Sequence, residues 1–65
     1  MKTTFKKVMP LNYIINFNSM WYELYINFDY SGKYSCYFFN EYFEANSENE
    51  IKKLVKNLLI ENSKH

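Results

Sequence analysis

The side chains able to do acid–base or nucleophilic chemistry are few in this sequence. His65 is the only histidine and stands at the last position, where we expect a frayed chain end that cannot hold a proton donor within reach of a substrate. Cys36 is the only cysteine, so the chain can build neither a disulfide framework nor a zinc site of several thiolates. Its apolar neighbours predict a buried, inert thiol, because burial raises a thiol pKa and no ordered histidine would activate it.

Two pairs of carboxylates are the remaining candidates for acid–base work or cation binding: Glu41 with Glu44, and Glu23 with Asp29. Neither pair is accompanied by a third oxygen ligand or by pocket-forming glycines, so we interpret both as solvated surface. The single glycine also excludes a glycine-rich phosphate loop. The sequence therefore predicts a protein that is not an enzyme and that holds no metal or cofactor.

The charge balance excludes strong electrostatic attraction to nucleic acid or anionic lipid. Eight basic residues, all lysines, face seven acidic ones, which leaves a net charge of +1. Lys52, Lys53 and Lys56 are expected on the solvated side of a helix, with a phosphate-contacting patch as the less favoured alternative. No apolar run approaches the roughly 20 residues of a membrane span, and no signal-peptide core follows Met1–Lys2. The Asn- and Lys-rich composition fits a low-GC bacterium or its phages, and an unpaired cysteine fits the cytoplasm.

Alternating apolar positions predict an antiparallel sheet in the first two thirds of the chain. In Leu11–Phe17 the odd positions, Tyr13 and Ile15 among them, are large and apolar, which is typical of a half-buried strand. The alternation is clearest from Met20 to Phe28. The first nine residues, with Thr3–Met9 as the candidate segment, are either a further edge strand or a flexible arm. An aromatic content of 22% excludes a disordered tail for the chain as a whole.

The segment Asp29–Lys33 contains the only glycine and predicts a three-residue hairpin loop with Gly32 in the left-handed region. This loop sets the register of the two strands that it joins, with Asp29 opposite Lys33. The inward pairs are then Phe28–Tyr34, Ile26–Cys36 and Leu24–Phe38, and the outward pairs are Asn27–Ser35, Tyr25–Tyr37 and Glu23–Phe39. The alternation changes phase at Asn40–Glu41, which predicts a bulge or tight bend before a short strand from Tyr42 to Ala45.

The last third of the sequence predicts one amphipathic helix from about Glu48 to Glu61. Ser47 and Glu50 have the spacing of a capping box, and an apolar stripe follows at helical intervals: Ile51, Leu54, Val55, Leu58 and Leu59. Asn62–His65 are expected to fray. With no repeat or linker, residues 1–65 form a single domain of the α+β class, a meander of three to four antiparallel strands packed on one C-terminal helix.

A single helix leaves much of this sheet uncovered, because a helix is about 10 Å wide and four strands span roughly 15–19 Å. The face turned away from the helix carries rings with acids among them, so we predict a partner interface formed by Trp21, Glu23, Tyr25, Asp29, Tyr37 and Phe39. Three interpretations stay open: contact with a protein target or a second copy, stacking on single-stranded nucleic acid, and burial within the same chain. The first is favoured, because acids interrupt the rings and the chain lacks arginine.

Two resemblances accompany these patterns. From Trp21 to Leu59, the order of strand, Asp-x-x-Gly-Lys hairpin, short strand and Ser-x-x-Glu helix start is similar to small antitoxin domains, although the glycine and proline residues that those domains carry before the helix are absent. This resemblance implies a homodimeric regulatory protein. In size and composition the chain is similar in kind to phage-encoded inhibitors, including anti-CRISPR-type proteins. The leading hypothesis is a small cytoplasmic inhibitor that occupies a surface of another protein, such as a nucleic-acid-binding host or defence factor.

Overall fold

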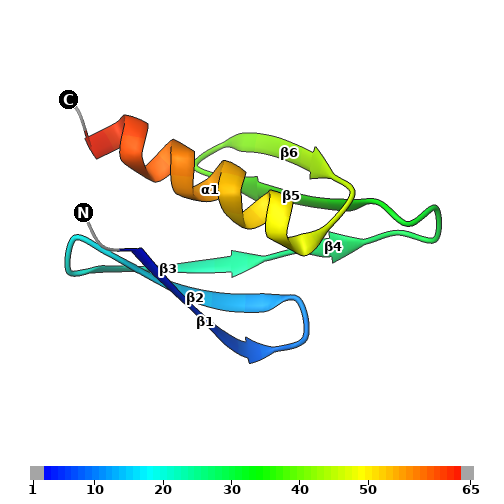
Figure 1. Ribbon diagram of the computed structural model, residues 1–65, viewed down its shortest axis with the longest axis horizontal. Coiled ribbons are helices and arrows are strands. Elements are labelled where there is room, and N and C mark those ends of the chain that lie inside the picture. Colours follow the sequence, from blue (N-terminus) through cyan, green and yellow to red (C-terminus); the bar gives the residue numbers. More distant parts are fainter. Residues whose placement is uncertain (1–2, 64–65) are drawn as a thin grey trace.

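Six β-strands precede one C-terminal helix in the computed structural model, which describes residues 3–63 (Figure 1). The elements are β1 Thr3–Met9, β2 Asn12–Phe17, β3 Met20–Tyr25, β4 Asn27–Phe28, β5 Tyr34–Phe38, β6 Glu41–Ala45 and α1 Glu48–Ser63. This architecture confirms the predicted α+β class, and Thr3–Met9 is a strand. Within residues 3–63, no helix is both long and apolar enough to cross a membrane.

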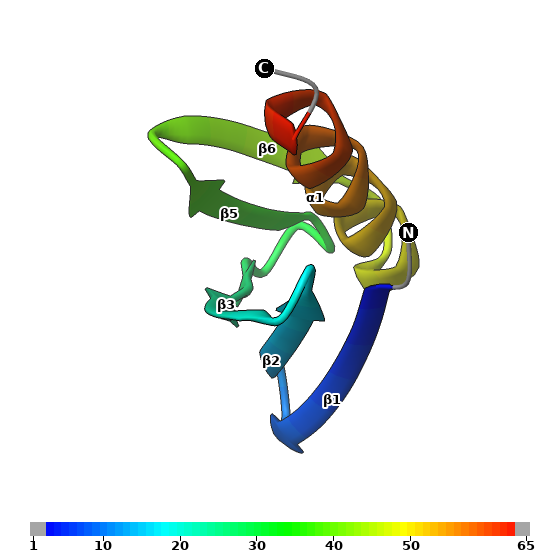
Figure 2. The ribbon, with the colours of Figure 1, turned by 90° about the vertical axis from the view of Figure 1, so that its left-hand side faces the viewer.

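The strands form two three-stranded antiparallel sheets instead of one continuous sheet. The first has the order β1-β2-β3 and the second the order β4-β5-β6, and only Ile26 separates β3 from β4. The amide of Ile26 donates a hydrogen bond to the Leu11 carbonyl, 2.9 Å away, which keeps this point of the chain beside the start of β2. Seen end-on, the two sheets curve around a shared interior, and α1 lies along the side that they leave open (Figure 2).

The division at Ile26 corrects part of the predicted register. Phe28–Tyr34 and Asn27–Ser35 pair as predicted. Beyond them β3 pairs with β2, where Glu23 lies opposite Ile14, so four predicted pairs are wrong: Ile26–Cys36, Leu24–Phe38, Tyr25–Tyr37 and Glu23–Phe39. The amide of Ile26 bonds to Leu11 beside β2, and Leu24 and Phe38 contribute to one core from different sheets instead of pairing with each other.

The predicted hairpin at Asp29–Lys33 is confirmed. Gly32 has a φ of +89°, a left-handed conformation that glycine adopts at little cost. Its amide donates to the Asp29 carbonyl at 3.2 Å, and the Asp29 amide donates to the Lys33 carbonyl at 3.0 Å. These two hydrogen bonds close the loop and place Phe28 beside Tyr34.

Phe39 and Asn40 form the tight bend predicted near Asn40–Glu41. Their φ values are 52° and 63°, and Asn18 and Ser19 in the turn between β2 and β3 have nearly the same values. Positive φ at both central residues is the mark of a type I′ turn, whose twist matches that of the paired strands. β6 therefore begins at Glu41, one residue earlier than predicted.

The helix begins at the predicted capping box, where Ser47 Oγ accepts a hydrogen bond from the Glu50 amide at 3.2 Å. It extends two residues beyond the predicted end: Asn62 and Ser63 are helical, which corrects the prediction that they fray, while Lys64–His65 lie outside the described residues. The helix contributes Ile51, Val55 and Leu59 to a core completed by seven strand or strand-linking residues: Tyr13, Ile15, Phe17, Leu24, Ile26, Cys36 and Phe38.

A polar contact joins the start of α1 to the first sheet. The Tyr13 hydroxyl on β2 donates a hydrogen bond to the Glu48 carboxylate, and Nζ of Lys7 lies 3.9 Å from an oxygen of the same carboxylate. Burial first, and then the hydrogen bond to Glu48 and its charge, raise the pKa of Tyr13 to about 12. Nζ of Lys52 lies 5.0 Å from the centre of the Tyr13 ring, within the range of a cation–π contact. These contacts hold the first turns of α1 to the first sheet.

Candidate functional site

Three of the six predicted interface residues share one face of β3. Trp21, Glu23 and Tyr25 alternate along the strand with the inward Tyr22 and Leu24, and they are exposed, Trp21 to 68% and Tyr25 to 59%. On the neighbouring strand β2, Ile14 lies opposite Glu23. We call the surface formed by Ile14, Trp21, Glu23 and Tyr25 the β3 aromatic surface. It lies on the side of the first sheet that faces away from the core, and nothing within residues 3–63 covers its rings.

A carboxylate stands among the rings of the β3 aromatic surface. The Tyr25 hydroxyl donates a hydrogen bond to Glu23, and this bond, followed by the negative charge of Glu23, raises the pKa of Tyr25. A hollow of about 140 Å³ adjoins this surface and shares three of its residues. Its lining residues are Val8, Met9, Asn12, Tyr13, Ile14, Glu23 and Tyr25. The surface therefore offers two rigid rings, a carboxylate and an apolar recess side by side.

Tyr37 is exposed as predicted but belongs to the second sheet. It is 73% exposed and lies opposite Tyr42 of β6, with 4.9 Å between the two ring centres. The Tyr42 hydroxyl donates to the Glu44 carboxylate at 3.1 Å. Since β3 and β5 do not pair, Tyr37 is not the cross-strand neighbour of Tyr25 that the sequence predicted.

Asp29 is held by its own loop. Its carboxylate accepts hydrogen bonds from the Ser31 amide at 2.9 Å, the Ser31 hydroxyl at 2.6 Å and the Lys33 amide at 3.1 Å. The bond from the Ser31 side chain, then that from the Lys33 backbone, hold the pKa of Asp29 below its usual value. These contacts give the Asp29 carboxylate a local role in shaping the hairpin.

Phe39 points elsewhere than predicted. Its ring lies against Tyr22 and Phe38, with ring centres 5.4 and 4.6 Å apart, and Tyr22 is an inward residue of β3. The sequence placed Phe39 opposite Glu23, on the outward face. The type I′ turn at Phe39–Asn40 explains the difference, because Phe39 is a turn residue and no longer follows the alternation of β5.

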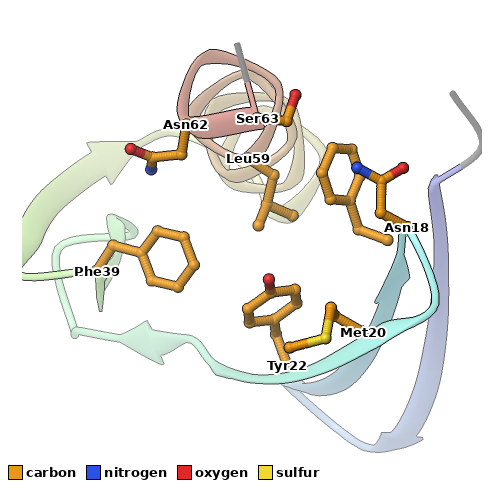
Figure 3. A pocket seen from close by; sticks show the side chains of 8 residues that line it. Asn18, Met20, Tyr22, Phe39, Leu59, Asn62 and Ser63 are labelled. Carbon is orange, nitrogen blue, oxygen red and sulfur yellow. The ribbon is translucent and has the colours of Figure 1, made fainter. Parts of the chain in front are cut away.

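An apolar cavity of about 200 Å³, which the sequence did not predict, lies at the end of the core where α1 finishes (Figure 3). The end of β2, the β2–β3 turn, β3, the β5–β6 turn and the end of α1 supply its walls: Phe17, Asn18, Met20, Tyr22, Phe39, Leu59, Asn62 and Ser63. Most of the lining side chains are apolar, and the polar groups are Asn18, Asn62, Ser63 and the Tyr22 hydroxyl. No periodic pattern marks such a cavity, because its walls come from elements that are far apart in the sequence. The one available signal was the predicted phase change at Asn40–Glu41, next to the turn residue Phe39 whose ring lines the cavity.

The groups with reactive chemistry remain apart. Cys36 is buried, and burial raises the pKa of its thiol. Among residues 3–63 no three histidine, cysteine or acidic side chains are grouped so that they could hold a metal ion, and His65 lies outside the described residues. Glu41 and Glu44 stand three positions apart on β6, so they point to opposite faces of the strand.

The helix lysines lie apart from the β3 aromatic surface. Lys52, Lys53 and Lys56 line a hollow of about 290 Å³ together with Phe5 and Asn49. This hollow is formed by α1 and the inward face of β1, whereas the β3 aromatic surface faces away from the core. The structure therefore separates the main group of cations from the exposed rings.

Comparison of the chain with protein-family models, with curated proteins and with solved structures finds no significant match.

Proposed function

We propose that the protein is a small, non-catalytic interaction module that occupies a surface of another protein through the β3 aromatic surface. The observation that carries this proposal is the exposure of Trp21 and Tyr25 on the same face of one strand. Tryptophan and tyrosine are the residues that most often anchor protein interfaces, and the paired strand fixes the backbone that carries them. A monomer that exposes neighbouring large rings commonly uses them for contact.

The charge at this surface favours a basic partner. Glu23 lies between the two rings along β3 and carries a carboxylate that Tyr25 orients by its hydrogen bond. A docked partner would bury this carboxylate, and an opposing lysine or arginine would compensate for its lost hydration. The most concrete version is a cytoplasmic inhibitor from a phage or mobile element that blocks a host or defence factor sterically. Where that factor binds nucleic acid, Glu23 would take the place of a phosphate.

Single-stranded nucleic acid is the alternative ligand for the same rings. Stacking platforms combine rings with cations that contact the phosphates. Here Glu23 lies between the rings, and Lys52, Lys53 and Lys56 line a separate hollow with Phe5. A titration with oligonucleotides at two salt concentrations separates the two functions. Tight binding with a steep salt dependence would favour nucleic acid and contradict the proposal.

The proposal is tested by capture of partners from a low-GC bacterial lysate on the immobilised wild-type protein, Trp21→Ala, Tyr25→Ala and a control, Tyr30→Ala. Tyr30 is a fully exposed aromatic residue at the tip of the β4–β5 loop, so the control removes an equivalent ring elsewhere. We expect one partner, identified by mass spectrometry, that the control retains and the two β3 variants lose. Far-UV circular dichroism should be the same for all four proteins. A partner that all three variants bind equally well would contradict the proposal.

A further inference from the structure

The outer edge of β6 presents a regular row of unpaired backbone groups. β6 is the last strand of the second sheet and pairs with β5 without a register shift over Glu41–Ala45. The two-residue turn at Phe39–Asn40 makes Phe38–Glu41 a hydrogen-bonded pair, and the bonding then alternates along an antiparallel ladder. Tyr42 and Glu44 consequently direct their amide and carbonyl groups away from β5. No strand within residues 3–63 takes up these groups.

The other end strands are less suited to pairing with a further strand. The register of β1 shifts between Lys7 and Met9, and Lys6 and Lys7 are exposed; a bulge and lysines are features that keep edge strands from pairing. β3 lies beside β5 within the fold, and β4 has only two residues. β6 carries no bulge, proline or lysine. Among the described strands, β6 therefore has the edge most open to another strand.

The sequence of β6 is complementary to itself in the antiparallel direction. With a two-fold axis at Phe43, Tyr42 lies opposite Glu44 of the second copy, and Glu41 lies opposite Ala45 of the second copy. No two like charges face each other, and the outward amide and carbonyl groups of Tyr42 and Glu44 meet those of the second copy. Tyr42 and Glu44 already bond within one chain at 3.1 Å, so the two side chains are chemically matched.

We propose that the protein forms a homodimer in which two β6 strands pair edge to edge and join the two second sheets into one six-stranded sheet. A two-fold interface of this kind closes after two copies, because each edge is used up by the other. Pairing also supplements a core that is small in a 65-residue chain. The dimer does not involve the β3 aromatic surface, so an experiment that contradicts the dimer does not contradict the proposed function, and the reverse also holds.

Two variants that place opposite charges at position 42 test both the dimer and its register. Tyr42→Glu places a carboxylate opposite Glu44 of the second copy, twice per dimer, whereas Tyr42→Lys places an ammonium there. Both variants lose the contact of Tyr42 with Tyr37 and its hydrogen bond to Glu44 of the same chain. They also place opposite charges beside that intrachain Glu44, so urea unfolding of each variant checks that the second sheet is equally stable before the dissociation constants are compared. Adding Glu44→Lys to Tyr42→Glu restores opposite charges. Sedimentation equilibrium over a range of protein concentrations measures the dissociation constant of each protein.

We expect a wild-type dimer that Tyr42→Glu weakens by about tenfold or more, that Tyr42→Lys largely retains, and that Tyr42→Glu/Glu44→Lys recovers. Trp21→Ala should leave the dimer intact, which separates edge pairing from association through the aromatic rings. A wild-type protein that stays monomeric at millimolar concentration would overturn the proposal. So would a dimer that Tyr42→Glu and Tyr42→Lys affect equally, or an open-ended series of larger species, which indicates pairing of β6 with another edge.

Discussion

Removal of a single oxygen atom, in Tyr13→Phe, tests how the helix is attached to the first sheet. The Tyr13 ring is 6% exposed, and its hydroxyl donates to Glu48 at the start of α1. A hydrogen bond to a charged group contributes about 1.5–3 kcal/mol. The Glu48 side chain keeps 26% of its surface exposed, so water partly replaces the lost donor and we expect a cost of about 1–2 kcal/mol. In a domain of this size that cost lowers Tm by roughly 5–15 °C.

The same contact makes a prediction for alkaline pH. Tyr13 has a pKa of about 12 in the folded protein against an ordinary value of 10.0, so the folded state keeps the phenol proton that the unfolded state loses. This contribution to stability is complete below pH 10 and disappears as the pH rises from about 10 to 12. Tyr13→Phe lacks this phenol and is otherwise the same chain. The stability gap between wild type and variant should therefore narrow over this range.

Urea unfolding followed by far-UV circular dichroism, at pH 7 and at several values between pH 9 and 11.5, measures this gap. Glu48→Gln completes a double-mutant cycle with Tyr13→Phe and isolates the coupling between the two side chains, which we expect to be about 1 kcal/mol. A Tyr13→Phe variant within about 0.3 kcal/mol of the wild type at pH 7 would refute the reasoning. A gap that stays constant up to pH 11.5 would refute the assigned cause of the pKa shift.

Three further predictions concern the hairpin, the helix start and the thiol. Gly32→Ala should lower the free energy of unfolding in urea by about 1 kcal/mol through backbone strain alone, since nothing lies within 4 Å of the added methyl group. Gly32→Asn should lower it less, because asparagine tolerates a positive φ better than alanine, and equal losses would contradict the left-handed conformation of residue 32. Ser47→Ala should cost about 1 kcal/mol and speed hydrogen exchange of the Glu50 amide, and unchanged exchange would argue against the cap. Cys36 should react with an aromatic disulfide reagent only as fast as the protein unfolds, so rapid reaction without denaturant would disprove its burial.

The features that the sequence predicted correctly are those with a local chemical cause. The Ser47–Glu50 capping box and the stripe after it locate the helix, and the only glycine locates the hairpin, because each signal lies within a few residues. The alternation along β3 likewise places Trp21 and Tyr25 on one exposed face.

The features that the sequence did not predict depend on which strands meet. The alternation from Met20 to Phe28 is unbroken, and Ile26 points inward whether or not the sheet divides there, so periodicity alone carries no sign of the division. Tyr37 and Phe39 joined the predicted interface only through pairing between β3 and β5. Phe39 also adopts a positive φ that bulky side chains rarely take, which propensity rules do not anticipate.

The position of Trp21 gives the protein a built-in optical reporter. It is the only tryptophan in the chain, and about two thirds of its surface is already exposed in the folded state. Its emission wavelength should consequently change little when the chain unfolds, and a melting curve recorded from this signal would be nearly flat. A blue shift of the same emission would instead mark the moment when another molecule covers β3, which lets binding be followed without any attached dye.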